Sequence, residues 1–197
     1  SPITIKINGV CVPINQDRLA PQAIVSLLAE RLTDAHFREL EDSRELNIGL
    51  PVQGIGSFRL SAFLQRGSIS AVIRFIPHDV PKLDALHLPE VLKDLIMERR
   101  GMILVVGAAG SGKSTTIASM LDHRNELSTG HVLTFEDPIE YLFRNKKSII
   151  NQREIGSDAR TLQAALRSAM RQAPDVIFIG EIRDRDTMSA AIAYSMS

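Results

Sequence analysis

The chain has 197 residues, enough for one large or two small domains, and its 44% hydrophobic and 23% charged residues are typical of a globular protein. Its 23 basic and 23 acidic residues give a formal net charge of zero, so no overall field favours nucleic acid or an anionic membrane as the main partner. Cys11 is the single cysteine, which excludes an intrachain disulfide and a cysteine-rich zinc site and fits a reducing cytoplasm. No stretch approaches ~20 apolar residues and no basic leader is present, so we expect neither a membrane span nor a secretory signal.

The first 77 residues have the pattern of a small α+β domain. Two β-rich runs flank Asn8-Gly9, a dipeptide typical of a tight hairpin turn. Helix-period apolar residues follow, and two more β-rich runs then flank Arg66-Gly67-Ser68. The expected elements are strands at 4–7 and 10–14, helices from Pro21 and over 35–46, and strands at 57–65 and 69–76. Strands and helices alternate without a chemical motif, which predicts an α+β domain over residues 1–77.

Prolines mark the passage to a second domain. Pro77, Pro81 and Pro89 interrupt the pattern, which predicts a stiff linker over residues 78–89 in place of packed structure. A helix is expected from Glu90, and short apolar strands then alternate with helices, as in a parallel sheet covered on both faces. The expected elements of this α/β domain over residues 90–197 are strands at 102–107, 131–136, 148–152 and 175–179, with helices at 113–127, 159–172 and 185–195.

A glycine-rich stretch in the second domain predicts a nucleotide site. Met102–Met120 reads MILVVGAAGSGKSTTIASM, and it contains the pattern G-x-x-x-x-G-K-[ST], which cradles nucleotide phosphates. An apolar strand before the loop and a helical pattern after it provide the order of elements that the pattern requires. The alternative is a glycine turn with an exposed lysine. The residues expected to bind nucleotide are Gly107, Ala108, Ala109, Gly110, Ser111, Gly112, Lys113, Ser114 and Thr115.

Each residue type in this loop has a physical task. The glycines allow a tight turn and bring backbone N–H groups against phosphate oxygens, next to the partial positive charge of a helix N-terminus. Lys113 is the mobile cation expected to reach the β- and γ-phosphates, and the Ser114 hydroxyl is expected to bind Mg²⁺. We therefore expect ATP and Mg²⁺ as cofactors.

Carboxylates follow two of the expected strands. Glu136 and Asp137 end one strand, and Glu181 follows another after an intervening glycine. Ligands in open α/β sheets bind at the carboxyl ends of the strands. We expect Glu136 to hold a water on Mg²⁺ or to orient the attacking water, and Glu181 to lie beside the metal as a ligand. Asp137 could instead only cap the turn at Pro138.

Arginines of the first domain are further candidates. Arg59 and Arg74 alternate with apolar neighbours, so they are expected to point away from that domain's core. A guanidinium suits a γ-phosphate whose charge shifts during the reaction, and an arginine delivered from another domain or subunit can act as a finger. Arg66, in the turn between the two strands, is a third candidate. The alternative is a solvated strand face.

Four motifs together resemble the secretion ATPase superfamily, and within it the type IV pilus retraction ATPases of the PilT and PilU type. They are GAAGSGKST at Gly107–Thr115, TFEDPIE at Thr134–Glu140, NQRE at Asn151–Glu154 and GEIRD at Gly180–Asp184. The stretches HRN at 123–125, STGHVLT at 128–134 and QAPDVI at 172–177 favour the PilU-like members. The resemblance covers nearly the whole chain.

The resemblance implies a PAS-like N-terminal domain joined to a RecA-like P-loop ATPase domain. Gly107–Thr115 would be the Walker A motif, Glu136 part of the acidic box and Glu181 the Walker B glutamate, with Arg59 and Arg74 approaching the γ-phosphate. ATP hydrolysis would change the angle between the domains and drive pilus retraction in twitching motility.

The same resemblance implies partners and a location. The subunit would form a homo-hexameric ring in the cytoplasm, at the inner-membrane face, on an inner-membrane pilus platform protein. A second retraction ATPase is a further possible partner, whereas nucleic acid is not expected.

Members of this family continue beyond the position of Ser197 into a histidine-containing box and a C-terminal helical region. The RecA-like domain is therefore expected to be incomplete within these residues, and its ATP turnover alone to be below the normal rate. Two other functions stay open. One is a nucleotide-binding accessory module within a partner ATPase ring, and the other is a pilus assembly or type II secretion ATPase, which shares the central motifs.

Overall fold

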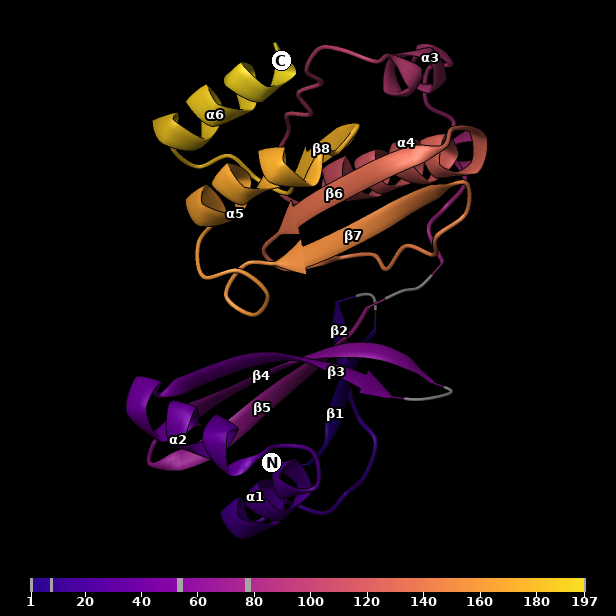
Figure 1. The fold of residues 1–197 in the computed structure, drawn as a ribbon. Coiled ribbons are helices and arrows are strands. Elements are labelled where there is room, and N and C mark those ends of the chain that lie inside the picture. The colour runs from indigo at the N-terminus through magenta and orange to yellow at the C-terminus, as the bar shows by residue number, and fades with distance from the viewer. Residues whose placement is uncertain (1, 8, 53–54, 77–78, 197) are drawn as a thin grey trace. The chain divides into compact units, whose positions relative to one another are not determined.

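The computed structural model divides the chain into two compact units, Ser1–Phe75 and Ile76–Ser197 (Figure 1). The described residues are 2–7, 9–52, 55–76 and 79–196. Asn8 of the expected hairpin turn, and Pro77 and His78 at the expected domain boundary, lie outside them. No helix in the described part of the chain is both long and apolar enough to cross a membrane.

The first unit is α+β, as expected. It contains a two-stranded antiparallel ribbon, two helices and a three-stranded sheet of order β3-β4-β5. Its elements are β1 (Thr4–Ile7), β2 (Val10–Pro13), α1 (Pro21–Ala29), α2 (Asp34–Ser43), β3 (Glu45–Val52), β4 (Gly56–Gln65) and β5 (Ser68–Ile76).

Strand β3 was not predicted, and the helix predicted over 35–46 is wrong at its C-terminal end. Helix α2 ends at Ser43 because Arg44 takes a left-handed conformation with φ 66°, from which β3 starts antiparallel to β4. Side chains in β3 then alternate in burial, with Leu46 fully buried. Gly49 and Pro51 lie inside this run, and both residue types are uncommon in strands. The β-propensity of the sequence therefore did not predict this strand, which forms by pairing with β4.

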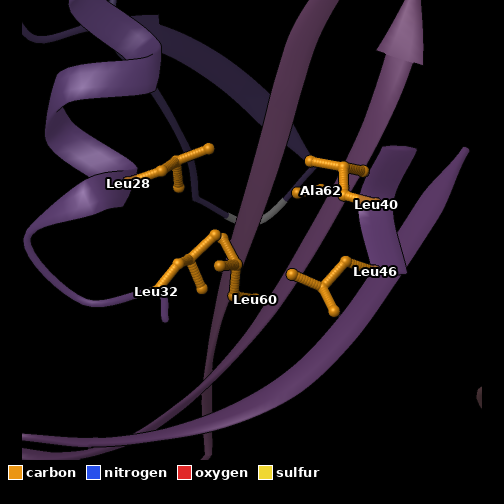
Figure 2. Close-up of a cluster of buried hydrophobic side chains, with 6 residues drawn as sticks. All are labelled: Leu28, Leu32, Leu40, Leu46, Leu60 and Ala62. Carbon is orange, nitrogen blue, oxygen red and sulfur yellow. The ribbon is translucent and has the colours of Figure 1, made fainter. Parts of the chain in front are cut away.

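Leucines from the helices and the sheet form the core of this unit (Figure 2). Leu28 of α1 and Leu40 of α2 meet Leu46 of β3 and Leu60 of β4, and Leu60 has no exposed surface. Removing this apolar surface from water is the main favourable term for the unit.

The second unit is built on a parallel sheet of order β7-β6-β8. Its elements are η1 (Leu83–Leu86), α3 (Val91–Met97), α4 (Lys113–Leu127), β6 (Gly130–Glu136), β7 (Ser148–Glu154), α5 (Leu162–Ala169), η2 (Met170–Gln172), β8 (Val176–Ile179) and α6 (Arg185–Ser195). The predicted helix over 159–172 starts later than expected, because Thr161 caps α5 by accepting a hydrogen bond from the Ala164 N–H.

Helices cover both faces of this sheet, as the sequence pattern predicts. Leu133 and Phe135 of β6 pack in one cluster with α5 and α6, whereas Val132 packs in another with Leu121 of α4. Figure 1 shows α4 on one side of the sheet and α5 and α6 on the other. Alternate residues of one strand therefore face opposite layers, and the strand ends lie open at the edge of the sheet.

Two expectations for the second unit are wrong. Residues 102–107 form no strand: Val106 is 89% exposed, and no strand among the described residues pairs with this segment. A strand needs a hydrogen-bonded neighbour, which apolar composition alone does not supply. The expected linker is also partly packed, because Leu83 of η1 is buried and η1 contacts α4.

We predict that Leu60→Ala lowers the free energy of unfolding of the first unit by about 2–5 kcal/mol, since it leaves a cavity in a closed core. Chemical denaturation measures this change. Ile73→Ala, at a site 59% exposed on β5, is the control and should cost less than about 1 kcal/mol. Equal losses in the two variants would contradict the placement of this core.

Candidate functional site

The glycine-rich loop turns directly into α4. Gly112 has φ 90°, a left-handed conformation that favours glycine, and it precedes Lys113 at the start of the helix without any side-chain cap. A Cβ at Gly107 would lie 2.7 Å from the Ser111 hydroxyl oxygen, so the loop folds back closely on its first residue. An uncapped helix start directs N–H groups and partial positive charge toward the loop, which makes it an anion site.

Lys113 folds back over this loop. Its ammonium Nζ donates to the carbonyl oxygens of Gly107 at 2.9 Å and Ala108 at 2.8 Å. The positive charge and the helix N-terminus therefore lie together. An entering phosphate could replace the two neutral carbonyls as the acceptor, and a charged acceptor makes the stronger hydrogen bond.

The residues present fit a nucleotide with Mg²⁺. Ser114 supplies a partly buried hydroxyl in the first turn of α4, and Glu181 supplies a carboxylate. Within the described ranges, no three His, Cys, Asp or Glu side chains gather as a metal site. Mg²⁺ commonly uses one or two protein oxygens plus substrate phosphates and water. A role for Ser114 and Glu181 as its protein ligands stays a proposal.

Glu136 is a buried carboxylate at the end of β6, with 6% of its surface exposed. Its Oε1 accepts hydrogen bonds from the Thr134 hydroxyl at 2.6 Å and from the Gln152 amide at 3.1 Å. Burial raises the pKa of the Glu136 carboxyl, and these two hydrogen bonds only partly oppose the rise. A carboxyl with a raised pKa at a strand end is suited to proton transfer or to orienting a water.

Glu181 lies beside Glu136 because their strands are neighbours. The Gly180 N–H donates to the Phe135 carbonyl at 2.7 Å, and a Cβ on Gly180 would lie 3.2 Å from the Glu136 Cα. Gly180 is the glycine that intervenes between the β8 strand and Glu181. Because it has no side chain, it allows the close approach of the two strand ends. Both glutamates line one pocket of about 150 Å³, as does Asp137. The Glu181 carboxylate pairs there with Arg183 Nε at 2.7 Å.

Hydrogen bonds connect this carboxylate end with the helix of the phosphate loop. The Thr115 hydroxyl of α4 lies 3.1 Å from the Tyr141 hydroxyl, and the Tyr141 carbonyl accepts from Gln152 Nε2 at 2.8 Å. The same Gln152 amide reaches Glu136. Sequence reasoning assigned no role to Thr134, Tyr141, Gln152 or Arg183. The NQRE motif, which contains Gln152, was the available signal for one of them.

Polar contacts fix the far end of α4. Asp122 accepts from Lys146 Nζ at 2.6 Å, and Arg124 donates to the carbonyls of Ile96 and Glu98 at 2.6 and 3.2 Å. Glu126 accepts from Lys146 at 2.9 Å and also from Lys82, and these contacts lower the pKa of the Glu126 carboxyl to about 2. The helix that begins at the phosphate loop is thus held at its other end by three segments of the chain.

The candidate arginines belong to the first unit. Arg59 lies in β4 opposite Gly49 of β3, Arg74 is exposed on β5, and Arg66 has a left-handed φ of 51° in the turn between the strands. A role for them at the nucleotide stays a proposal.

A glycine-rich loop opening a helix, beside a parallel sheet with carboxylates at two strand ends, defines the P-loop nucleotide-binding class of protein. The chain is 41% identical over 194 residues to the type IV pilus ATPase PilU of Pseudomonas aeruginosa, covering 98% of this chain and 51% of PilU. It is 39% identical over 191 residues to the retraction ATPase PilT of the same organism, covering 97% of this chain and 56% of PilT.

A solved structure is also similar. The crystal structure of the pilus retraction motor PilT with bound ADP superposes with a TM-score of 0.95 at 41% identity, covering all of this chain and 58% of that one. The model of the family described as type II/IV secretion system protein matches residues 3–197. The chain belongs to this family, which lies within the secretion ATPase superfamily, and it spans about half the length of the curated relatives it matches.

The raised pKa of Glu136 predicts a pH dependence of stability. Between the ordinary glutamate pKa of 4.5 and the higher folded pKa, the folded chain binds more protons than the unfolded chain, so stability falls as pH rises through this range. Glu136→Gln should remove that fall.

Urea midpoints measured from ~pH 4 to ~pH 8 test this prediction. Glu98→Gln, which neutralises an exposed carboxylate in the same unit, is the control and should retain the wild-type slope. Identical slopes in wild type and Glu136→Gln would show that this carboxylate does not titrate from a buried position.

Proposed function

We propose that the chain is the nucleotide-binding part of an ATPase motor subunit that drives type IV pilus retraction. The observation that carries the proposal is that hydrogen bonds through Tyr141 and Gln152 link the helix of the P-loop to Glu136, and that Glu136 and Glu181 line one pocket. The names of the relatives PilU and PilT, and the ADP in the PilT crystal structure, support the same assignment.

Each residue then has a role in ATP hydrolysis. The loop N–H groups and the Lys113 ammonium would bind the phosphates, and Ser114 and Glu181 would hold the metal. When bound with the nucleotide, Mg²⁺ would neutralise part of the negative charge of the phosphates. Glu136 orients the attacking water and accepts its proton, for which its buried, hydrogen-bonded carboxylate is suited.

Arginines would complete the site. We propose that Arg59 and Arg74 approach the γ-phosphate from the first unit, of the same or of a neighbouring subunit, and stabilise charge there. Hydrolysis would then change the angle between the units. Arg59→Ala and Arg74→Ala are expected to lower kcat in the full-length protein while leaving ADP binding intact.

The remaining parts of the proposal concern assembly. We propose that the subunit forms a homo-hexameric ring in the cytoplasm and acts on an inner-membrane platform protein, and the family assignment and the names of the relatives support this.

Two substitutions separate binding from hydrolysis. In the full-length protein, Lys113→Ala should weaken ATP binding at least about tenfold, because it removes the cation that faces the phosphates. Glu181→Gln should retain nucleotide binding but lower kcat at least about 100-fold. Binding is measured with a fluorescent ATP analogue, and turnover by phosphate release.

Lys147→Ala is the matched control, because this exposed lysine lies in the loop before β7 and should behave as wild type. Unchanged binding and turnover in Lys113→Ala would refute the proposed function. Wild-type turnover in Glu181→Gln would refute the role given to that carboxylate.

A further inference from the structure

Gln152 of β7 makes three hydrogen bonds with its side-chain amide. Its Nε2 donates to Glu136 Oε1 at 3.1 Å and to the Tyr141 carbonyl at 2.8 Å, and its Oε1 accepts from the Phe143 N–H at 2.9 Å. A glutamine amide has two N–H donors, and both are used here. One side chain therefore holds the Glu136 carboxylate and the loop that follows β6 at the same time.

The carboxylate is held in one orientation. Thr134 and Gln152 both donate to Oε1 of Glu136, one from the same strand and the other from its neighbour. Two donors on a single oxygen fix the rotation of the carboxylate plane, and a backbone hydrogen bond from Glu140 also stabilises the charged form of the carboxylate.

The held loop also reaches the phosphate-loop helix. Tyr141, whose carbonyl accepts from Gln152, places its hydroxyl 3.1 Å from the hydroxyl of Thr115, two residues after Lys113. A path of contacts from the first turn of α4 to Glu136 therefore runs through Tyr141 and Gln152. A neutral amide suits this position, because it can donate to a carboxylate and accept from a backbone N–H together.

We propose that Gln152 is a positioning residue, which sets the orientation of Glu136 relative to the bound nucleotide and ties it to the P-loop helix through Tyr141. The proposal rests on the proposed function, in which Glu136 orients the attacking water. In this proposal Gln152 acts on catalysis through the Glu136 carboxylate, to which its Nε2 donates.

A double-mutant cycle in the full-length protein tests this role. Gln152→Met keeps the side-chain length but removes the donors, and it should lower kcat at least about tenfold while KM for ATP changes less than about threefold. In the Glu136→Gln background, the same change should cause no further loss of kcat, because the carboxylate that Gln152 orients is already absent.

Asn151→Met is the matched control. Asn151 is the preceding residue of β7, and its amide oxygen contacts His131 Nε2 at 2.8 Å, so the substitution also removes one amide contact from the same strand. Wild-type kcat is expected in this variant. A loss of kcat in Gln152→Met that persists fully in the Glu136→Gln background, or that Asn151→Met reproduces, would overturn the proposal.

Unfolding midpoints of wild type, Gln152→Met, Glu136→Gln and the double variant test the Gln152–Glu136 contact without measuring turnover. If Gln152 and Glu136 interact, the double substitution costs less stability than the sum of the two single ones. An absence of turnover in wild type would refute the proposed function alone, whereas additive losses of stability would refute the Gln152–Glu136 interaction alone.

Discussion

A buried carboxylate at the end of a parallel strand is costly unless hydrogen-bond donors surround it, and Glu136 has them from two neighbouring strands. This requirement explains several features at once. Thr134 lies two residues earlier on the same strand, Gln152 lies opposite Thr134 in the parallel register, and Gly180 keeps the third strand end close. The chemistry that the site can perform depends on this arrangement, since a carboxylate in water would have neither its raised pKa nor its fixed orientation.

The second constraint is the anchoring of α4. Its first turn carries Lys113, Ser114 and Thr115, whereas its last turns are held by ion pairs and by hydrogen bonds to carbonyls elsewhere in the unit. A helix is a rigid element, so fixing its far end also fixes where its N-terminus points. In the proposed function this anchoring preorganises the start of α4 for phosphate, and preorganisation reduces the entropic cost of binding.

The sequence predicted the elements of the second unit well where the pattern is local. The bounds of α4 and α6 agree with the structure, because Gly112 and Asp184 mark where these helices begin. Strand β3 was missed, and a strand was wrongly expected at residues 102–107. In both cases strand formation depends on a neighbouring strand, which the local sequence pattern does not reveal. The P-loop and the two glutamates were visible as motifs with a chemical role. Gln152 lay in a motif to which no role was assigned and Tyr141 lay in none, because their roles arise only where strands and loops distant in sequence meet.

The central claim is that Lys113, Glu136 and Glu181 serve one magnesium nucleotide. A crystal structure of the full-length protein with Mg²⁺ and a non-hydrolysable ATP analogue tests it most directly. The account predicts phosphates against the Lys113 ammonium and the start of α4, the metal between Ser114 and Glu181, and the Glu136 carboxylate facing the γ-phosphate. A nucleotide bound at this loop with both glutamates remote from its phosphates would contradict the account.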